Sequence, residues 1–208
     1  MTMYSLCTQL VDEGKLEAAL ASFAEAERRF TREIGVLRRR FLQCVPQPHL
    51  IWAATEWTSE RAHNAAAQSI MQVRADDRVA SAFFRPGQYW EAFALPVPGA
   101  QLAGEGPAEL VIVARALVAD RCAGGWEQRV AARFAALARP AGLVRAQLWQ
   151  NYACRREAVA FLEWRDEDAY AAGRLVGERT VEEELLVAAP RSDLASYDQF
   201  ECRPLHLA

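Results

Sequence analysis

Apolar residues recur with two different spacings along the 208-residue chain. Between residues 15 and 32 they return every three or four positions, which is typical of an amphipathic helix. Before and after that stretch they alternate with polar residues, which is typical of half-buried strands. The first half of the chain therefore predicts strands at 3–11, 36–44, 49–57 and 88–95, with helices at 15–32 and 60–83.

The same succession returns in the second half of the chain. Glu56-Trp57 is followed by Glu60, Ala62 and Ala65, and the same residue types stand 107 positions later as Glu163-Trp164, Glu167, Ala169 and Ala172. Ser59 and Asp166 stand where each helix begins and can accept its unpaired amide hydrogens. Strands are predicted at 109–118, 144–153, 157–164 and 195–202, with helices at 125–138 and 167–187.

Each half has the order β-α-β-β-α-β, which is the ferredoxin-like arrangement. Such a unit covers one face of its sheet with helices and leaves the other face bare. Two units in one chain can bury their bare faces against each other and form a barrel-like core. We therefore expect an α+β fold of two tandem repeats, 1–95 and 108–208, joined by a Pro/Gly-rich linker at 96–107.

The alternation within strands separates the side chains that face the helices from those that face the other way. Trp57 and Trp164 are expected under the helices, so that Glu56 and Glu163 point into the barrel. Apolar walls with a few polar groups are typical of a small-molecule pocket. An alternative is that the charged residues form cross-strand pairs that hold the strand register. The residues expected in this interior or at its mouths are Arg38, Arg40, Trp52, Glu56, Arg145, Gln147, Trp149, Asn151 and Glu163.

Among the three histidines, His63 is the candidate proton carrier, because it lies on the helix after the first Glu-Trp pair and imidazole titrates near neutral pH. The alternative is an ordinary surface or core histidine, and its counterpart in the second half is Tyr170.

Composition narrows the function classes. A net charge of −3 lacks the basic surface that nucleic-acid binding needs. The N-terminus has no secretory signal, and no run approaches the roughly 20 apolar residues that cross a membrane. Five scattered cysteines without a CxxC pair are typical of a reducing cytoplasm, and the three histidines lack metal-site spacing. We expect a cytoplasmic protein that binds a small molecule and contains neither metal nor cofactor.

Two segments carry a family resemblance. His49–Trp57 runs into Ser59-Glu60-Arg61-Ala62, and Glu157–Trp164 runs into Asp166-Glu167-Asp168-Ala169. Both resemble the strand ending in Trp, followed by an acidic helix start, of the antibiotic biosynthesis monooxygenase (ABM) domain in the dimeric α+β barrel superfamily. The resemblance implies an intrachain dimeric α+β barrel, because single-domain members pair as homodimers and a tandem chain supplies both halves. A further homodimer of the tandem chain stays open.

The resemblance also implies an activity. Cofactor-independent members oxidise phenolic polyketides, so we expect a small-molecule enzyme acting on an aromatic or polyketide-like compound. Arg38, Arg40 or Arg145 would stabilise the substrate anion, and Glu56, Glu163 or His63 would accept its proton. The haem-degrading branch is not matched, because its catalytic Asn has no counterpart on either first strand.

Two alternatives to oxygenation stay open, so that catalysis itself is undecided. One is a ligand-binding or stress-associated barrel without activity, and the other is a related isomerase or cyclase. An open pocket with an unpaired arginine or histidine would favour an enzyme. An interior filled by Trp52, Trp149 and paired arginine–glutamate groups would favour binding or a structural role.

Overall fold

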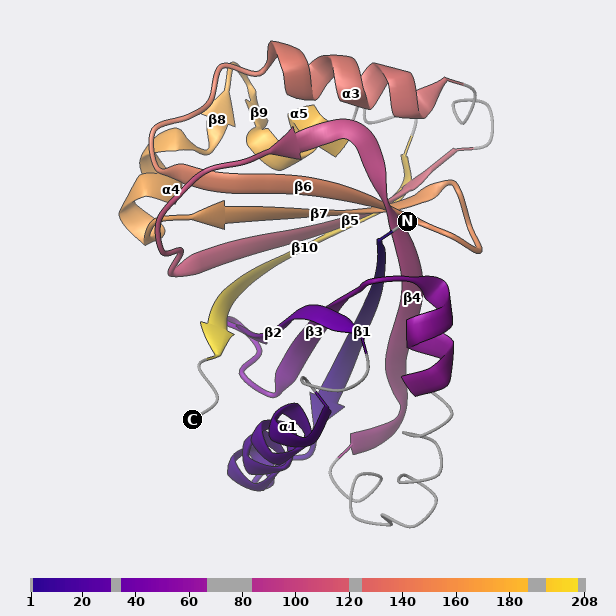
Figure 1. Ribbon diagram of the computed structural model, residues 1–208. Coiled ribbons are helices and arrows are strands. Elements are labelled where there is room, and N and C mark those ends of the chain that lie inside the picture. The colour runs from indigo at the N-terminus through magenta and orange to yellow at the C-terminus, as the bar shows by residue number, and fades with distance from the viewer. Residues whose placement is uncertain (1, 31–34, 67–83, 120–124, 187–193, 206–208) are drawn as a thin grey trace. The chain divides into compact units, whose positions relative to one another are not determined.

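The computed structural model describes residues 2–30, 35–66, 84–119, 125–186 and 194–205 (Figure 1). The first half contains β1 (Met3–Val11), α1 (Leu16–Phe30), β2 (Val36–Cys44), β3 (Leu50–Trp57), a helix whose described part is 60–66, and β4 (Phe84–Leu102). The second half contains β5 (Leu110–Val118), α3 (Trp126–Ala136), β6 (Leu143–Asn151), β7 (Glu157–Trp164), α4 (Glu167–Gly173), β8 (Leu175–Val176), β9 (Arg179–Thr180), α5 (Val181–Leu186) and β10 (Leu194–Leu205).

The long strands have the hydrogen-bonded order β1-β3-β2-β10-β5-β7-β6-β4, which closes on itself. This confirms the predicted α+β barrel class. The chain divides into two compact units, Met1–Phe93 with Leu205–Ala208, and Ala94–Pro204, and each is described by itself below. In the first unit β3 pairs antiparallel with β1 and β2, and in the second β7 pairs antiparallel with β5 and β6.

Three strands of the first unit have counterparts of equal length at equivalent positions of the second unit. The bounds of β5, β6 and β7 are those of β1, β2 and β3 moved by 107 residues, without an insertion between them. This constant offset supports the predicted duplication. The predicted limits of the two repeats stay a prediction, since the strands do not define where each repeat starts and ends.

The glycines directly before β2 and β6 match in the same way. Gly35 and Gly142 both have a positive φ, of 76° and 85°. Their carbonyl oxygens accept hydrogen bonds from the amides of Thr58 at 2.8 Å and Arg165 at 2.9 Å. Both glycines also lie against the first turn of the following helix, where a Cβ atom would come within 2.7 Å of the Ala62 Cβ or 2.4 Å of the Ala169 Cβ. The offset thus preserves a tight contact as well as the strands.

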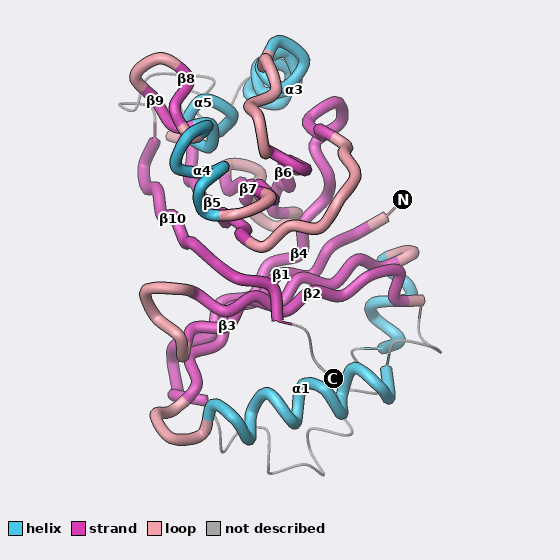
Figure 2. Tube along the Cα trace, turned by 90° about the vertical axis from the view of Figure 1, so that its left-hand side faces the viewer, coloured by secondary structure: helices cyan, strands magenta, loops and turns pink. Residues whose placement is uncertain are grey.

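In the first unit α1 lies along one face of β1, β2 and β3 (Figure 2). The apolar cluster on that face includes Val11, Ala19 and Ile51, and the rings of Phe23 and Phe41 stack with their centroids 5.1 Å apart. The row that contains Phe41 and Ile51 therefore faces α1, as the alternation predicts. The neighbouring row, which contains Glu56, points to the opposite face.

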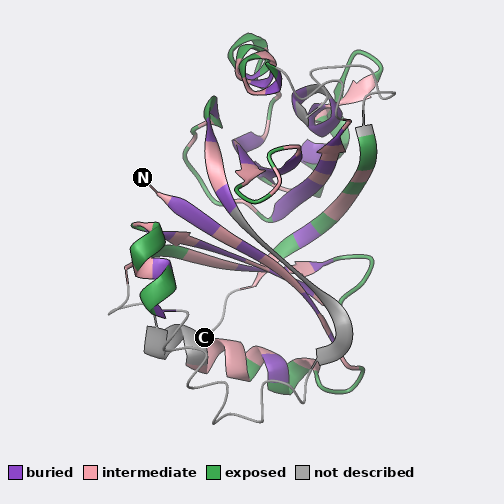
Figure 3. Ribbon diagram, turned by 90° about the vertical axis from the view of Figure 1, so that its right-hand side faces the viewer, coloured by how far each residue is buried: buried purple, intermediate pink, exposed green. Residues whose placement is uncertain are grey.

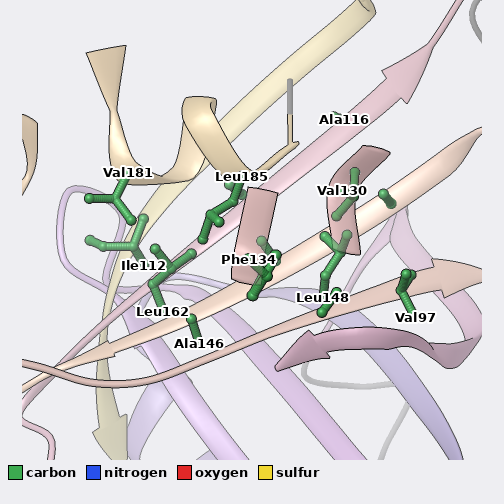
Figure 4. Packing of buried hydrophobic residues seen from close by; sticks show 14 of the residues in the cluster. Val97, Ile112, Ala116, Val130, Phe134, Ala146, Leu148, Leu162, Val181 and Leu185 are labelled. Atoms are coloured by element: carbon green, nitrogen blue, oxygen red, sulfur yellow. The ribbon is translucent and has the colours of Figure 1, made fainter. Parts of the chain in front are cut away.

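The helices of the second unit bury a larger apolar cluster against β5, β6 and β7. Val130 and Phe134 come from α3, and Val181 and Leu185 from α5 (Figure 4). They meet one row of strand side chains, which includes Ile112, Ala116, Ala146, Leu148, Ala160, Leu162 and Trp164. Every residue of β7 is buried (Figure 3), and its helix-side row, which includes Ala160, Leu162 and Trp164, belongs to this cluster.

The prediction of one continuous helix over 167–187 is wrong, because the structure has two shorter helices there. α4 ends at Gly173, the hairpin β8–β9 turns at Gly177 with a φ of 66°, and α5 starts at Val181. The α5 start is a capping box: the Thr180 hydroxyl accepts from the Glu183 amide at 3.2 Å, and the Glu183 carboxylate accepts from the Thr180 amide at 3.3 Å. These local bonds outcompete a continued helix.

The predicted linker at 96–107 is also wrong in its first half. Residues 96–102 are the end of β4, and Pro96 and Gln101 pair with Trp149 and Gln147 of β6. The register shifts between these pairs, where Gly99 has a φ of 75°. A bulge of this kind lets the strand continue past two prolines. The predicted strand at 88–95 lies inside β4, whereas most of the predicted helix at 60–83 lies outside the described residues.

Candidate functional site

The face away from the helices holds the predicted site residues of the second unit. Arg145, Gln147, Trp149 and Asn151 form one row on β6, and Glu163 lies on the matching row of β7, because the alternate residues Ala146, Leu148, Leu162 and Trp164 are in the helix-side core. The interpretation of these two strands is therefore confirmed.

Glu163 and Arg145 form an ion pair. They are cross-strand partners, and the Arg145 Nε lies 3.3 Å from a Glu163 carboxylate oxygen. Glu163 is only 5% exposed, and the other end of Arg145 donates to the Gly106 carbonyl at 3.5 Å. A buried carboxylate needs such a partner to remain charged. This is the cross-strand pairing that the sequence left open as the alternative to a pocket.

Aromatic rings fill the next positions on this face. Trp149 is fully buried, and its ring lies 4.4 Å from that of Phe161, centroid to centroid. Gln147 is half-buried and stands opposite Phe161 in the register. The centre of this face is therefore apolar packing, with the charged pair toward one end of the strands.

Asn151 belongs to a different group at the other end of β6, about 20 Å from Arg145 along the strand. Its amide donates to Glu157 at 2.5 Å, and the same carboxylate accepts from Arg115 at 2.5 Å. The Asn151 side-chain oxygen accepts from the amide of Ala153 at 2.9 Å. These bonds fix the β6–β7 turn, so that Asn151 is not brought together with Arg145 and Glu163.

The first unit places a tyrosine beside its equivalent carboxylate. On β3, Glu56 stands opposite Tyr4 of β1 and opposite Arg38 of β2. Arg40 follows two residues later in the same row as Arg38. Tyr4 is 6% exposed, Glu56 and Arg40 are half-buried, and Arg38 is exposed. Four polar side chains from three strands thus lie on the face away from α1.

The Tyr4 hydroxyl interacts directly with Glu56. Burial raises the pKa of Tyr4 to about 12, and the charge of Glu56 and a hydrogen bond to it act in the same direction. Arg40 and Arg38 lower the pKa of Tyr4 by a smaller amount. The phenol is therefore neutral at physiological pH and serves as a hydrogen-bond donor.

Trp52 is 1% exposed and stands opposite Leu42 in the β2–β3 register. The equivalent pair in the second unit is Trp149 opposite Val159. Each unit therefore places one indole at this position, on opposite strands of the hairpin. Both indoles are buried, so neither is an exposed pocket wall.

His63 is not brought together with the other predicted residues of the first unit. Its ring lies edge-on to Trp57, 5.1 Å between centroids, and its Nδ1 is 3.1 Å from the Asn64 side-chain oxygen. Trp57 and Glu56 are successive residues of one strand, so that their side chains leave opposite faces of the sheet. The matching contact in the second unit is Trp164 with Tyr170, at 5.4 Å.

Sequence reasoning missed Tyr4, Arg115 and Glu157. The alternation gave no signal for Tyr4, because its place opposite Glu56 depends on the β1–β3 register, as the place of Val111 opposite Glu163 depends on the β5–β7 register. Arg115 and Glu157 stand on strands whose pairing depends on turn lengths, which alternation alone does not give.

A second polar group of the second unit lies on the helix side. Gln199 of β10 donates to the Tyr170 hydroxyl at 2.9 Å and accepts from Tyr197 at 3.0 Å. Glu182 of α5 is fully buried nearby, and burial raises its pKa above the usual value. Burial also raises the pKa of Tyr170, with Glu182 as the second cause.

Within the described ranges, no group of three or more His, Cys, Asp or Glu residues could hold a metal ion. The helices of the described part of the chain include none that is long and apolar enough to span a bilayer.

The first unit also carries the match to a known family. Residues 8–77 match the antibiotic biosynthesis monooxygenase (ABM) family model. The ABM match covers α1, β2 and β3, and thus includes Arg38, Arg40 and Glu56. It confirms the resemblance drawn from the strand that ends at Trp57. No curated protein gives a significant match to the sequence.

Solved structures share the fold of this chain over nearly its whole length. An anthrone oxidase-like protein has a TM-score of 0.75 at 13% identity, with 99% of this chain and 92% of that chain covered. A "putative monooxygenase" from Fusobacterium nucleatum subsp. nucleatum has 0.73 at 12%, covering 99% and 93%. A major regulator of staphylococcal pathogenesis has 0.56 at 9%, covering 97% and 99%. Likeness at such identities shows the fold alone.

Proposed function

We propose that the chain is a cofactor-independent monooxygenase for an aromatic or polyketide-like compound, and that its working groups lie in the first repeat. The observation that carries the proposal is the group of Tyr4, Arg38, Arg40 and Glu56 on the face away from α1. Three of these residues lie within the ABM match. A carboxylate between cations and a neutral donor can take a proton and stabilise the anion that forms.

The proposed reaction converts a phenol-activated CH₂ group and O₂ into a carbonyl group and water. Glu56 accepts a proton from the carbon, and Arg38 and Arg40 stabilise the resulting enolate. The enolate carbon transfers its electrons to O₂ and forms a C–O bond, and Glu56 returns the proton to the peroxide. The second C–H proton and the terminal hydroxyl then leave as water, so that the substrate itself supplies both electron pairs.

The second repeat supports the assignment to the first by contrast. Val111 and Gln147 stand where the first repeat has Tyr4 and Arg40. Glu163 is buried against Arg145, and breaking that pair would leave an uncompensated charge. We therefore assign Arg145 and Glu163, with Trp149 and Phe161, to the stability of the second unit.

The test is oxygen uptake by the purified chain with tricyclic phenolic substrates of the anthrone type. In ¹⁸O₂, mass spectrometry should find one labelled atom in the product carbonyl. Glu56→Gln should lower turnover at least about 100-fold, the usual contribution of a general base. Glu163→Gln is the matched control and should keep most of the activity at a temperature where circular dichroism shows it folded. Equal losses in the two variants would contradict the proposal.

A ligand-binding barrel without turnover is the second candidate. It is favoured by the burial of Trp52 in the first unit, and by the burial of Trp149 and the Arg145–Glu163 pair in the second. Calorimetric binding of the same phenols without oxygen uptake would identify this function. A rearranged product of unchanged mass, formed without oxygen uptake, would instead indicate an isomerase or cyclase.

A further inference from the structure

We infer that Tyr4 is the positioning residue that makes Glu56, rather than Glu163, the working carboxylate of this chain, an inference that rests on the function proposed above. Tyr4 lies outside the ABM match, on β1. Its role would be to hold the Glu56 carboxylate by a hydrogen bond and to keep it from closing onto Arg38.

The strand register supports this role. Tyr4 and Arg38 stand directly opposite Glu56 on its two sides, and directly opposite residues of antiparallel strands have Cβ atoms about 5 Å apart. Glu56 thus lies between a phenol and a guanidinium. Tyr4 is buried, so that little water competes for its hydroxyl, whereas Arg38 is exposed and hydrated. The phenol is therefore the partner that orients the carboxylate.

The second repeat provides an internal comparison. The same register places Val111 and Arg145 on the two sides of Glu163. Without a hydroxyl on β5, Glu163 pairs with Arg145 at 3.3 Å and is buried. The two carboxylates share the backbone position and the arginine directly opposite, and of the two residues directly opposite each carboxylate only the tyrosine differs. The carboxylate with the tyrosine opposite, Glu56, is half-buried, whereas the one without it, Glu163, is buried against its arginine.

The phenol can keep this role over the working range of pH. It remains protonated, because its pKa is raised to about 12. A neutral donor stabilises the charged form of Glu56 without neutralising it, and so leaves the carboxylate able to accept a proton. Tyr4, Arg38 and Arg40 are the titratable or charged groups that face Glu56 from β1 and β2.

Tyr4→Phe tests the inference, with Tyr197→Phe as the matched control, since Tyr197 donates its hydroxyl to Gln199 in the second unit. The first readout is the titration of the Tyr4 phenol in the free protein, followed by NMR of ¹³C-labelled tyrosine and assigned with Tyr4→Phe. Glu56→Gln should lower the pKa of Tyr4, because the charge of Glu56 and a hydrogen bond to it raise that pKa, and Glu163→Gln should not. The second readout is turnover: Tyr4→Phe should lower kcat about 10-fold and leave KM nearly unchanged, and Tyr197→Phe should change neither.

An unchanged Tyr4 titration in Glu56→Gln would overturn the inference, and so would an unchanged kcat in a folded Tyr4→Phe. If Tyr4→Phe does not fold, the Tyr4 titration in Glu56→Gln decides alone. The proposed function fails in a different way, by full oxygen uptake in Glu56→Gln. The titrations need no substrate, so that the two failures are distinguishable.

Discussion

Arg38 and Arg145 occupy equivalent positions 107 residues apart, yet their surroundings differ. Arg38 is exposed, whereas 27% of the Arg145 side chain is exposed and its partner Glu163 is buried. Removing an exposed charge changes the stability little, whereas removing one member of a buried pair leaves the other charge buried without its partner. The same substitution should therefore have different effects in the two repeats.

We expect Arg145→Ala to lower the free energy of unfolding by about 2–3 kcal/mol, somewhat less than for a fully buried pair. Arg38→Ala should change it by less than about 0.5 kcal/mol. Urea unfolding followed by tryptophan fluorescence measures both. In the double variant Arg145→Ala/Glu163→Gln part of the loss should be recovered, because no charge is left buried. Equal effects of the two single variants would contradict the pairing.

Glu182 makes stability depend on pH. Burial raises its pKa in the folded protein, against smaller opposing effects of Thr180, Tyr170 and Arg174. A raised pKa means that Glu182 contributes stability below its usual pKa, near 4.5, which is lost as the pH rises through its folded value. At pH 8, Glu182→Gln should thus be more stable than the natural chain by about 1–3 kcal/mol.

Thermal unfolding of both proteins between pH 4.5 and 8 measures this difference, which should shrink toward the acidic end. Glu178→Gln, at an exposed residue next to Gly177, is the control and should change the free energy of unfolding by less than about 0.5 kcal/mol. A constant difference for Glu182→Gln across the range would mean that Glu182 does not titrate in this interval.

At the scale of elements, the turn before β6 is fixed by a close approach to α4. Gly142→Ala would have to strain a positive φ and would bring its Cβ within 2.4 Å of the Ala169 Cβ. We expect a loss of about 2–4 kcal/mol in unfolding free energy. Gly177→Ala has the same kind of φ but open space around it, and should lose about 1 kcal/mol. Chemical unfolding of the two variants separates the contact from the backbone strain, and equal losses would exclude the contact.

The strands could be predicted from sequence more closely than the helices that follow them. β1 and β7 have the predicted bounds, because alternation and the Glu-Trp ends mark them. The predicted helix over 167–187 is wrong, because the spacing of apolar residues does not reveal the turn at Gly177 or the capping box of Thr180 and Glu183. Those signals are local and were present in the sequence.

At the scale of the whole molecule, the duplication predicted the fold and part of the candidate site. Alternation gave the rows of Glu56 and Glu163 correctly, because successive residues of a strand point to opposite faces of the sheet. It could not give the partner opposite each carboxylate, since the register depends on turn lengths and bulges. Tyr4 was missed for that reason, and His63 was grouped with Glu56 although Trp57 lies between it and the other face.

The proposed chemistry also predicts the behaviour of the whole protein toward cofactors. The deprotonated substrate supplies the electrons, so that neither flavin, haem nor metal takes part. Dialysis against EDTA should leave oxygen uptake within about twofold, and the visible spectrum of active protein should show no absorbing group. Loss of activity that returns with one added metal ion would refute cofactor independence.

The constant offset of 107 residues gives the two equivalent hairpins the same length. Residues 36–57 and 143–164 each span two strands and one connection, without an insertion between them. A recombination event could therefore transplant one hairpin into the other repeat without shifting any downstream register. The proposed chemistry uses only the hairpin of the first unit, so that substitutions in the second hairpin that keep its length would leave the strand pairing of the first unchanged.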